Sequence, residues 1–247
     1  MSLIAKAFFM SLGMFTALPC PYRPWDEDAR DMMLVCLPIV GAVVGLLWAL
    51  LTALGMTWMT PGLAAALLVA LPWLLTGFIH LDGYMDTCDA ILSWRPLEQR
   101  LRILKDAHTG AFSVVGLGLL MLFSYAAAGS IVWADLPALL FIPIISRCCS
   151  AFCVLTLPSI GHSEYAKLEG KSAQRIAIGT MWLLAVVICA IWLGGGVTAL
   201  LIETLAYFLA MLWAAHTLKG VSGDVAGFAL SAAECAALIA LACRHAA

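Results

Sequence analysis

Long apolar stretches alternate with short polar connections along this sequence. A transmembrane helix needs about 20 consecutive apolar residues. A shorter apolar stretch, residues 3–18, ends in a proline-rich segment and predicts an N-terminal re-entrant or interfacial helix. The pattern predicts an all-α polytopic integral membrane protein with about seven transmembrane helices in a single domain, residues 1–247. The predicted spans are 33–54, 62–81, 111–133, 136–157, 176–194, 197–216 and 225–243.

Composition excludes a water-soluble fold. Of the 247 residues, 64% are hydrophobic and 11% are charged, and the mean hydropathy is +1.01. Soluble domains average about 25% charged residues. The net charge of −2 and the lack of a long basic run argue against a nucleic-acid partner. The expected surroundings are a lipid bilayer.

The basic residues predict the orientation of the chain, because Lys and Arg gather in cytoplasmic connections. Ten of the 13 basic residues fall in connections on one side of the predicted membrane. Three polar segments, 82–110, 161–175 and 217–224, emerge on that same side. We therefore expect an active site that faces the cytoplasm. The opposite connections, which contain no Lys or Arg, lie near 55–61, 134–135 and 194–196.

Three carboxylates, Asp82, Asp86 and Asp89, directly follow an apolar stretch in a chain that is otherwise poor in charge. On an α-helix, offsets of four and seven residues place them within an arc of about 60°. Carboxylates so close repel one another unless a cation lies among them, and their oxygens suit Mg²⁺, with Mn²⁺ as an alternative. A solvated helix start is the other interpretation, since aspartate is common there. The spacing favours a metal site.

Two polar connections contain further candidates. Lys105 and Asp106 end a predicted short amphipathic helix, 96–106. An acid and a cation returned to the membrane surface could complete a phosphate and metal site, and a solvated interfacial helix is the alternative. Lys219 and Asp224 lie in a glycine-rich segment, whose backbone N–H groups suit an anion, although one such loop is a weak signal.

Ionisable residues inside predicted spans are functional candidates, because a charge in lipid is costly. Arg147, Glu203 and Glu234 qualify. Glu234 lies about 15 Å along a helix from Asp224, too far to share one ion. We expect Glu234 to pair with a basic partner or to line a substrate cleft. His80 stands at the entry to the acidic stretch, and a packing or hydrogen-bonding role is the alternative to substrate contact.

The stretch His80–Asp89 (HLDGYMDTCD) resembles the H-L-D-G-x-x-D-T-x-D-G signature of the cobalamin synthase family, the adenosylcobinamide-GDP ribazoletransferases. Other stretches resemble family motifs in the same order, so the resemblance covers nearly the whole chain. These stretches are Phe15–Pro19, Leu37–Gly41, Lys105–Gly110, Tyr165–Gly170 and Gly220–Gly227.

The resemblance implies transfer of the adenosylcobinamide phosphate group from its GDP ester to α-ribazole or α-ribazole 5′-phosphate. GMP leaves, and the product is adenosylcobalamin or its 5′-phosphate, late in cobalamin biosynthesis. It implies a Mg²⁺-dependent enzyme of the bacterial inner membrane, as a homo-oligomer or with other cobalamin-assembly enzymes. Asp82, Asp86 and Asp89 would hold the metal, and one of them or Asp106 would be the base. Expected substrate contacts are His80, Lys105, Arg147, Lys219, Asp224 and Glu234.

Two other classes use spaced acids in a membrane. A secondary transporter or ion channel carries cations on acids near the bilayer midplane, whereas these acids lie at the end of a predicted span. A lipid CDP-alcohol phosphotransferase has a D-G-x-x-A-R pattern, which does not follow Asp82 and Gly83 here. Both remain alternatives.

Overall fold

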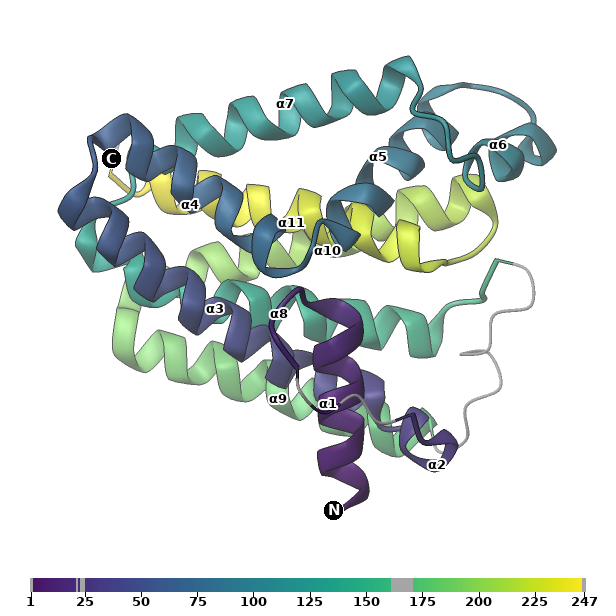
Figure 1. Cartoon of the computed structure of the whole chain (residues 1–247), viewed down its shortest axis with the longest axis horizontal. Helices are drawn as coiled ribbons and strands as arrows, with labels where there is room; N and C mark the ends of the chain where they lie inside the picture. The colour runs from purple at the N-terminus through teal and green to yellow at the C-terminus, as the bar shows by residue number, and fades with distance from the viewer. Residues whose placement is uncertain (1, 21, 23–24, 161–170, 246–247) are drawn as a thin grey trace.

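The computed structural model describes residues 2–20, 22, 25–160 and 171–245, and every regular element in these ranges is a helix (Figure 1). Two short 3-10 helices, η1 (Trp133–Asp135) and η3 (Gly194–Gly196), precede α8 and α10. The α-helices are α1 (Leu3–Phe15), α2 (Glu27–Arg30), α3 (Met33–Trp58), α4 (Pro61–Leu75), α5 (Ile79–Leu92), α6 (Leu97–Ile103), α7 (Ala111–Ala128), α8 (Leu136–Thr156), α9 (Lys171–Leu193), α10 (Val197–Leu218) and α11 (Gly223–Cys243).

Six helical segments are long and apolar enough to cross a bilayer: α3, α7, η1 with α8, α9, α10 and α11. They coincide with six of the seven predicted spans. A seventh crossing exists only if α4 and α5 are counted together as one bent span. The structure therefore confirms a polytopic α-helical membrane protein, with six crossings or up to seven.

The predicted span 62–81 is wrong as one continuous helix. α4 ends at Leu75 and α5 begins at Ile79, and the axes of the two helices differ in direction by 92°. Gly77 and Phe78 have left-handed backbone conformations, with φ of 61° and 63°, and these end a right-handed helix. The 15 residues of α4 span about 22 Å, less than the hydrocarbon core of about 30 Å. The bend directs α5, with its three acids, away from the axis of α4.

Two glycines let α3 and α8 pack closely. A side chain at Gly41 would strike the carbonyl of Pro143, and one at Gly45 would strike the carbonyl of Leu140. Small residues allow such close approach of helix backbones in membranes. α8 and α11 are the most deeply buried of the apolar helices, and α11 packs against α5, α7, α8 and α10. α9 faces outward over most of its length.

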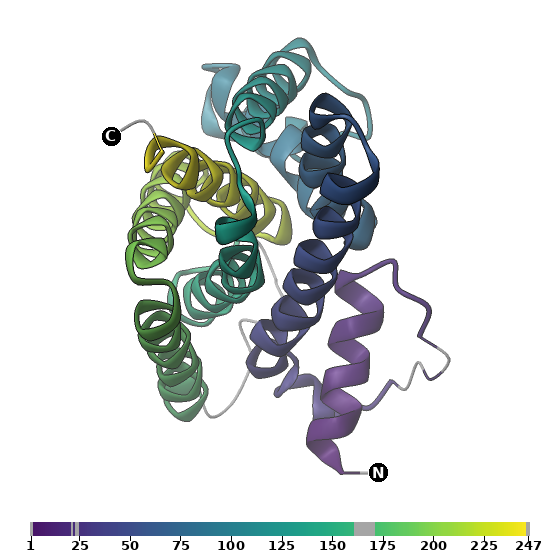
Figure 2. The same cartoon turned by 90° about the vertical axis from the view of Figure 1, so that its left-hand side faces the viewer.

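The predicted short N-terminal helix is present as α1, which lies outside the main bundle and packs against α3 (Figure 2). Lys6 on α1 forms a 2.6 Å ion pair with Asp26, the N-cap of α2. This contact fixes α1 against the segment that precedes α3. Whether α1 is interfacial or re-entrant stays a prediction.

The polar connections gather at one end of the bundle (Figure 1). The connection from α5 through α6 to α7, the end of α8 and the turn between α10 and α11 lie at the right of that view. The turn between α3 and α4 and the C-terminus lie at the left. This arrangement agrees with the grouping predicted from the basic residues.

Candidate functional site

The helices α5 and α11 cross with almost no space between their backbones. A Cβ atom at Gly83 would lie 2.7 Å from the Cα of Asp224, and one at Gly227 would lie 2.9 Å from the carbonyl oxygen of His80. Neither contact could be relieved by moving a flexible side chain, because each is with backbone. Glycine at these positions therefore brings Asp224 directly beside the acids of α5.

Four carboxylates form what we call the acid cluster: Asp82, Asp86 and Asp89 of α5 and Asp224 of α11. The charges of the other three all act on Asp86, and the charge of Asp82 also acts on Asp224. Asp82 is exposed, whereas Asp86 and Asp224 are partly buried. The predicted trio thus gains a fourth acid from a helix more than 130 residues further along the chain.

Asp89 is turned toward α7. It is buried, and its carboxylate oxygens accept hydrogen bonds from the backbone N–H groups of Gly110 (2.7 Å) and Ser113 (3.0 Å). A carboxylate at a helix N-terminus is stabilised by these otherwise unpaired donors. Asp89 therefore joins α5 to the start of α7. Its role as a metal ligand stays a prediction, and an ion would have to bind to the lone pairs that these two hydrogen bonds leave free.

We expect Asp89→Asn to reduce stability. An amide can accept at only one end, so one N–H group of α7 would face an N–H donor. An unpaired buried donor costs about 1–3 kcal/mol. Thermal unfolding in one detergent would measure the loss against exposed Asp28→Asn as a control. A melting temperature equal to that of the wild type would show that the contact with α7 contributes little.

The acid cluster suits Mg²⁺ by the chemistry of its ligands, since carboxylate oxygens are hard donors. In the described ranges, no group of three or more His, Cys, Asp or Glu side chains is arranged to hold an ion. Mg²⁺ commonly binds through only one or two carboxylates, with waters and substrate phosphates as its other ligands. Asp82 and Asp86 would meet that requirement.

The connection after α6 contains the predicted residues Lys105 and Asp106, which are both exposed. This connection leads back to the acid cluster at Gly110, whose backbone N–H donates a hydrogen bond to Asp89. Asp106 instead forms a 2.7 Å contact with the ring of His108, and this hydrogen bond lowers the pKa of Asp106. A lower pKa makes Asp106 a weaker proton acceptor, and its role as the base stays a prediction.

The glycine-rich segment is a fixed turn between α10 and α11. Lys219 caps α10 in a left-handed conformation and is exposed, and the hydroxyl of Ser222 accepts a hydrogen bond from Val225 at the start of α11. The backbone of Val221 pairs with Pro158 and Ile160 after α8. The turn lies at the same end of the bundle as the connection from α5 through α6 to α7 (Figure 1).

Arg147 and Glu234 form a buried ion pair of 2.6 Å between α8 and α11. The hydroxyl of Ser146 also donates to Glu234 (2.9 Å). Glu203 of α10 is fully buried nearby, and neither of its oxygens has a hydrogen-bond partner in the described part of the chain. The expectation that Glu234 pairs with a basic partner is confirmed. Neither member of the pair lines the cavity described next, and the predicted substrate contacts of Arg147 and Glu234 stay predictions.

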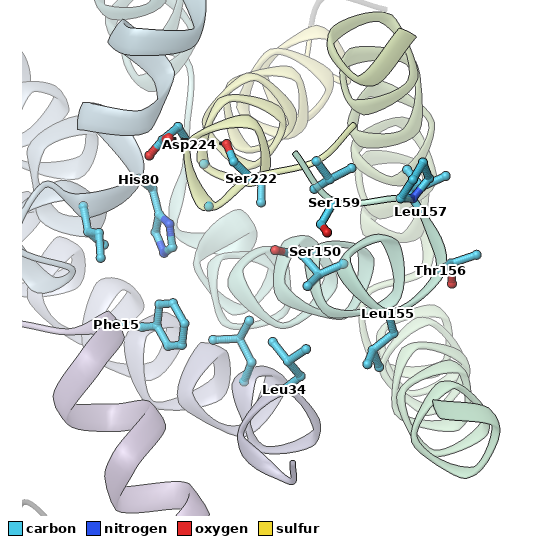
Figure 3. Close-up of a pocket in the computed structure, with 18 residues that line it drawn as sticks. Phe15, Leu34, His80, Ser150, Leu155, Thr156, Leu157, Ser159, Ser222 and Asp224 are labelled. Atoms are coloured by element: carbon cyan, nitrogen blue, oxygen red, sulfur yellow. Dashed lines mark hydrogen bonds between the residues drawn. The ribbon is translucent and has the colours of Figure 1, made fainter. Parts of the chain in front are cut away.

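A cavity of about 570 Å³ adjoins the acid cluster. It lies between the ends of α1 and α8 and the starts of α3, α5 and α11 (Figure 3). Asp224 is on its wall and also belongs to the acid cluster, so the two features are continuous. Other lining residues include Phe15, His80, Ser150, Val154 and Ser222. No sequence motif pointed to Ser150 or Val154.

His80 is placed as expected at the entry to the acidic stretch, and its side chain lies between Asp224 and Phe15 (Figure 3). Its ring is nearly parallel to that of Phe15, with centroids 6.4 Å apart. Its Nε2 atom is buried and has no hydrogen-bond partner among the described residues. The predicted motif Tyr165–Gly170 lies outside the described residues.

The fold and the site together define the class: a multi-pass membrane protein whose acids gather at one end of the bundle. Within that class, the model of the cobalamin-5-phosphate synthase family matches residues 7–242. The chain therefore belongs to this family, and the resemblance found in the sequence is confirmed.

Relatives agree with this assignment. The chain is similar to the adenosylcobinamide-GDP ribazoletransferase of Clostridium botulinum (strain Alaska E43 / Type E3), with 38% identity over 237 residues, 93% of this chain and 94% of the relative. It is similar to that of Clostridium perfringens (strain SM101 / Type A), with 37% identity over 252 residues, 98% of this chain and 99% of the relative. No solved structure matches. The family favours a transferase of cobalamin synthesis over a transporter, a channel or a lipid phosphotransferase.

Proposed function

We propose that this protein transfers the adenosylcobinamide phosphate group of adenosylcobinamide-GDP to α-ribazole or its 5′-phosphate. The acceptor hydroxyl oxygen bonds to the phosphorus next to cobinamide, and the bond from that phosphorus to the GMP oxygen breaks. GMP leaves, and the product is adenosylcobalamin or its 5′-phosphate. The names of the relatives include the donor, adenosylcobinamide-GDP, and ribazole, which is the acceptor in this reaction.

The observation that carries this proposal is the crossing of α5 and α11. It places Asp224 beside Asp82 and Asp86 and, at the same time, on the wall of a cavity. A group-transfer enzyme needs an acceptor held next to the charged groups that act on it. The crossing meets this requirement, because Asp82 and Asp86 come from one family motif and Asp224 comes from another.

The residues of the chain would share the work as follows. Asp82 or Asp86 accepts the proton of the acceptor hydroxyl, since a positioned carboxylate can act as a general base. Lys105 and Lys219 offset the charge of the diphosphate. The two segments that contain them, the connection after α6 and the turn between α10 and α11, lie at the same end of the bundle (Figure 1). We propose Mg²⁺ as the cofactor, with Mn²⁺ as a substitute, held by Asp82 and Asp86. When bound, the ion neutralises charge on the phosphoryl oxygens and the leaving group.

The reaction can be tested directly. Purified protein in lipid nanodiscs is incubated with adenosylcobinamide-GDP, Mg²⁺ and either α-ribazole or its 5′-phosphate, and GMP is measured. We expect GMP to form only when donor and acceptor are both present, and to be suppressed by a chelator. Absence of GMP with both acceptors would contradict the proposed function, and activity in chelator would contradict only the metal.

Lys105→Ala and Lys219→Ala are expected to raise the KM for adenosylcobinamide-GDP by about 5- to 20-fold each. Both lysines are exposed, so the loss of a charge that binds phosphate should not affect folding. Exposed Arg102→Ala, on α6, is the matched control. Unchanged KM values in both lysine variants would mean that these residues are only solvated.

We propose that the acid cluster faces the cytoplasm from the bacterial inner membrane. Cys243 is the one exposed native cysteine and the other eight are buried, so Cys243 is first replaced by Ser. Cysteines at Gln99 and Ser172 should then react with an impermeant reagent only from the cytoplasmic side, and one at Thr198 only from outside. Labelling of positions 99 and 198 from one side would overturn the topology.

A further inference from the structure

We propose that the 570 Å³ cavity is the subsite for the acceptor nucleoside, α-ribazole, and that the corrinoid donor reaches the acid cluster from outside this cavity. This assignment rests on the proposed function. It further states that the acceptor lies on the cavity side of the acid cluster and the donor on the other side. Four observations carry it: the size of the cavity, the charge of its walls, the unpaired His80 nitrogen and the position of Asp224.

Size separates the two substrates. Pockets of about 300–1,000 Å³ enclose ligands of drug size, and the cavity falls within that range. α-Ribazole consists of one aromatic base and one ribose, which is a molecule of that size. The donor combines a corrin macrocycle, an adenosyl group and GDP and is several times larger. Only the acceptor can be enclosed as a whole.

The walls favour an uncharged aromatic group over the GDP end of the donor. Among the described residues that line the cavity there is no Lys or Arg, and Asp224 is the one acid. A diphosphate placed there would meet a carboxylate and no cation of the described lining, which is costly in a partly buried site. Apolar side chains such as Leu34, Leu37 and Val154 instead suit a methylated benzimidazole ring.

His80 offers the kind of contact that such a base requires. His80 lies on the cavity wall, and its Nε2 is buried and lacks a partner in the described ranges. A small turn of the ring would let a ligand supply that partner and relieve the cost of an unsatisfied polar group. The benzimidazole of α-ribazole has one free ring nitrogen, which matches one donor. The nearly parallel rings of His80 and Phe15, with planes 10° apart, offer a flat base an aromatic surface.

Asp224 then sets the direction of the nucleoside. It is the residue shared by the cavity wall and the acid cluster, so the sugar must lie toward Asp224 if its hydroxyl is to react. The hydroxyl oxygen bonds to the cobinamide-linked phosphorus, its proton passes to a carboxylate of α5, and GMP leaves on the side away from the cavity. The base remains beside His80.

Val154→Phe tests the assignment by filling the cavity. We expect the KM for α-ribazole to rise at least about tenfold, with the KM for adenosylcobinamide-GDP within about twofold of the wild type. Val187→Phe, the same change at an exposed position of α9, should alter neither value. Benzimidazole alone should inhibit the wild type competitively against α-ribazole and not against the donor.

A rise in the KM for the donor in Val154→Phe, or no change for either substrate, overturns the assignment while GMP release by the wild type still supports the proposed function. If the wild type releases no GMP, the proposed function itself fails. Should Val154→Phe not fold, His80→Phe serves instead, because it keeps a ring beside Phe15 and removes the nitrogen. The same selective rise in KM for α-ribazole is expected, and an unchanged value overturns the assignment.

Discussion

Replacing Asp86 with asparagine is expected to remove most of the activity and to leave the fold intact. Asparagine keeps the size and polarity of the side chain but removes the charge that a divalent cation or a transferred proton needs. Transition-state stabilisation should fall by about 3 kcal/mol or more, which is a rate loss of more than about 100-fold. The measurement is GMP release at saturating concentrations of both substrates.

Stability separates a catalytic role for Asp86 from a structural one. Asp86 lies among three like charges, so its neutralisation should leave the melting temperature in chelator unchanged or slightly higher. The rise in melting temperature on adding Mg²⁺ should become smaller, because binding to the folded state is weakened. Asp28→Asn, at an exposed position of α2, is the control. Near-normal activity in Asp82→Asn, Asp86→Asn and Asp224→Asn alike would place the chemistry elsewhere.

Much of this architecture could be predicted from local patterns. Apolar length alone located six of the spans, because a bilayer imposes the same minimum on every crossing helix. The grouping of Lys and Arg located the polar end of the bundle. The spacing of Asp82, Asp86 and Asp89 indicated a site because helix geometry fixes which side chains share a face.

Features that depend on contacts between distant residues could not be predicted in this way. The one proline of residues 62–81, Pro72, lies inside α4, and neither a proline nor a charge marks the break at Gly77 and Phe78. The apolar run therefore read as one helix. The partners of Asp89 are backbone N–H groups of another helix, which no composition or spacing reveals. The cavity depends on five helices meeting, and its walls include ordinary residues such as Val154.

Breaking the ion pair between Arg147 and Glu234 should have the largest effect on stability. Arg147→Met removes the positive charge that neutralises Glu234 and leaves a buried carboxylate without its partner. Removing one member of a buried pair costs about 3–5 kcal/mol. Unfolding by denaturing detergent would measure the loss. Arg102→Met, which breaks an exposed pair with Glu98, should cost about 1 kcal/mol or less.

The double variant Arg147→Met, Glu234→Leu decides whether the pair serves the fold or the substrate. If the two charges mainly balance each other, removing both should restore stability to within about 1 kcal/mol of the wild type, since no unpaired charge remains. GMP release should recover with it, because neither side chain lines the cavity. A stable double variant with a raised KM would show that the pair contacts substrate after all. Failure of the double variant to recover stability would show that Arg147 chiefly balances another acid, and fully buried Glu203 lies close enough to be that acid.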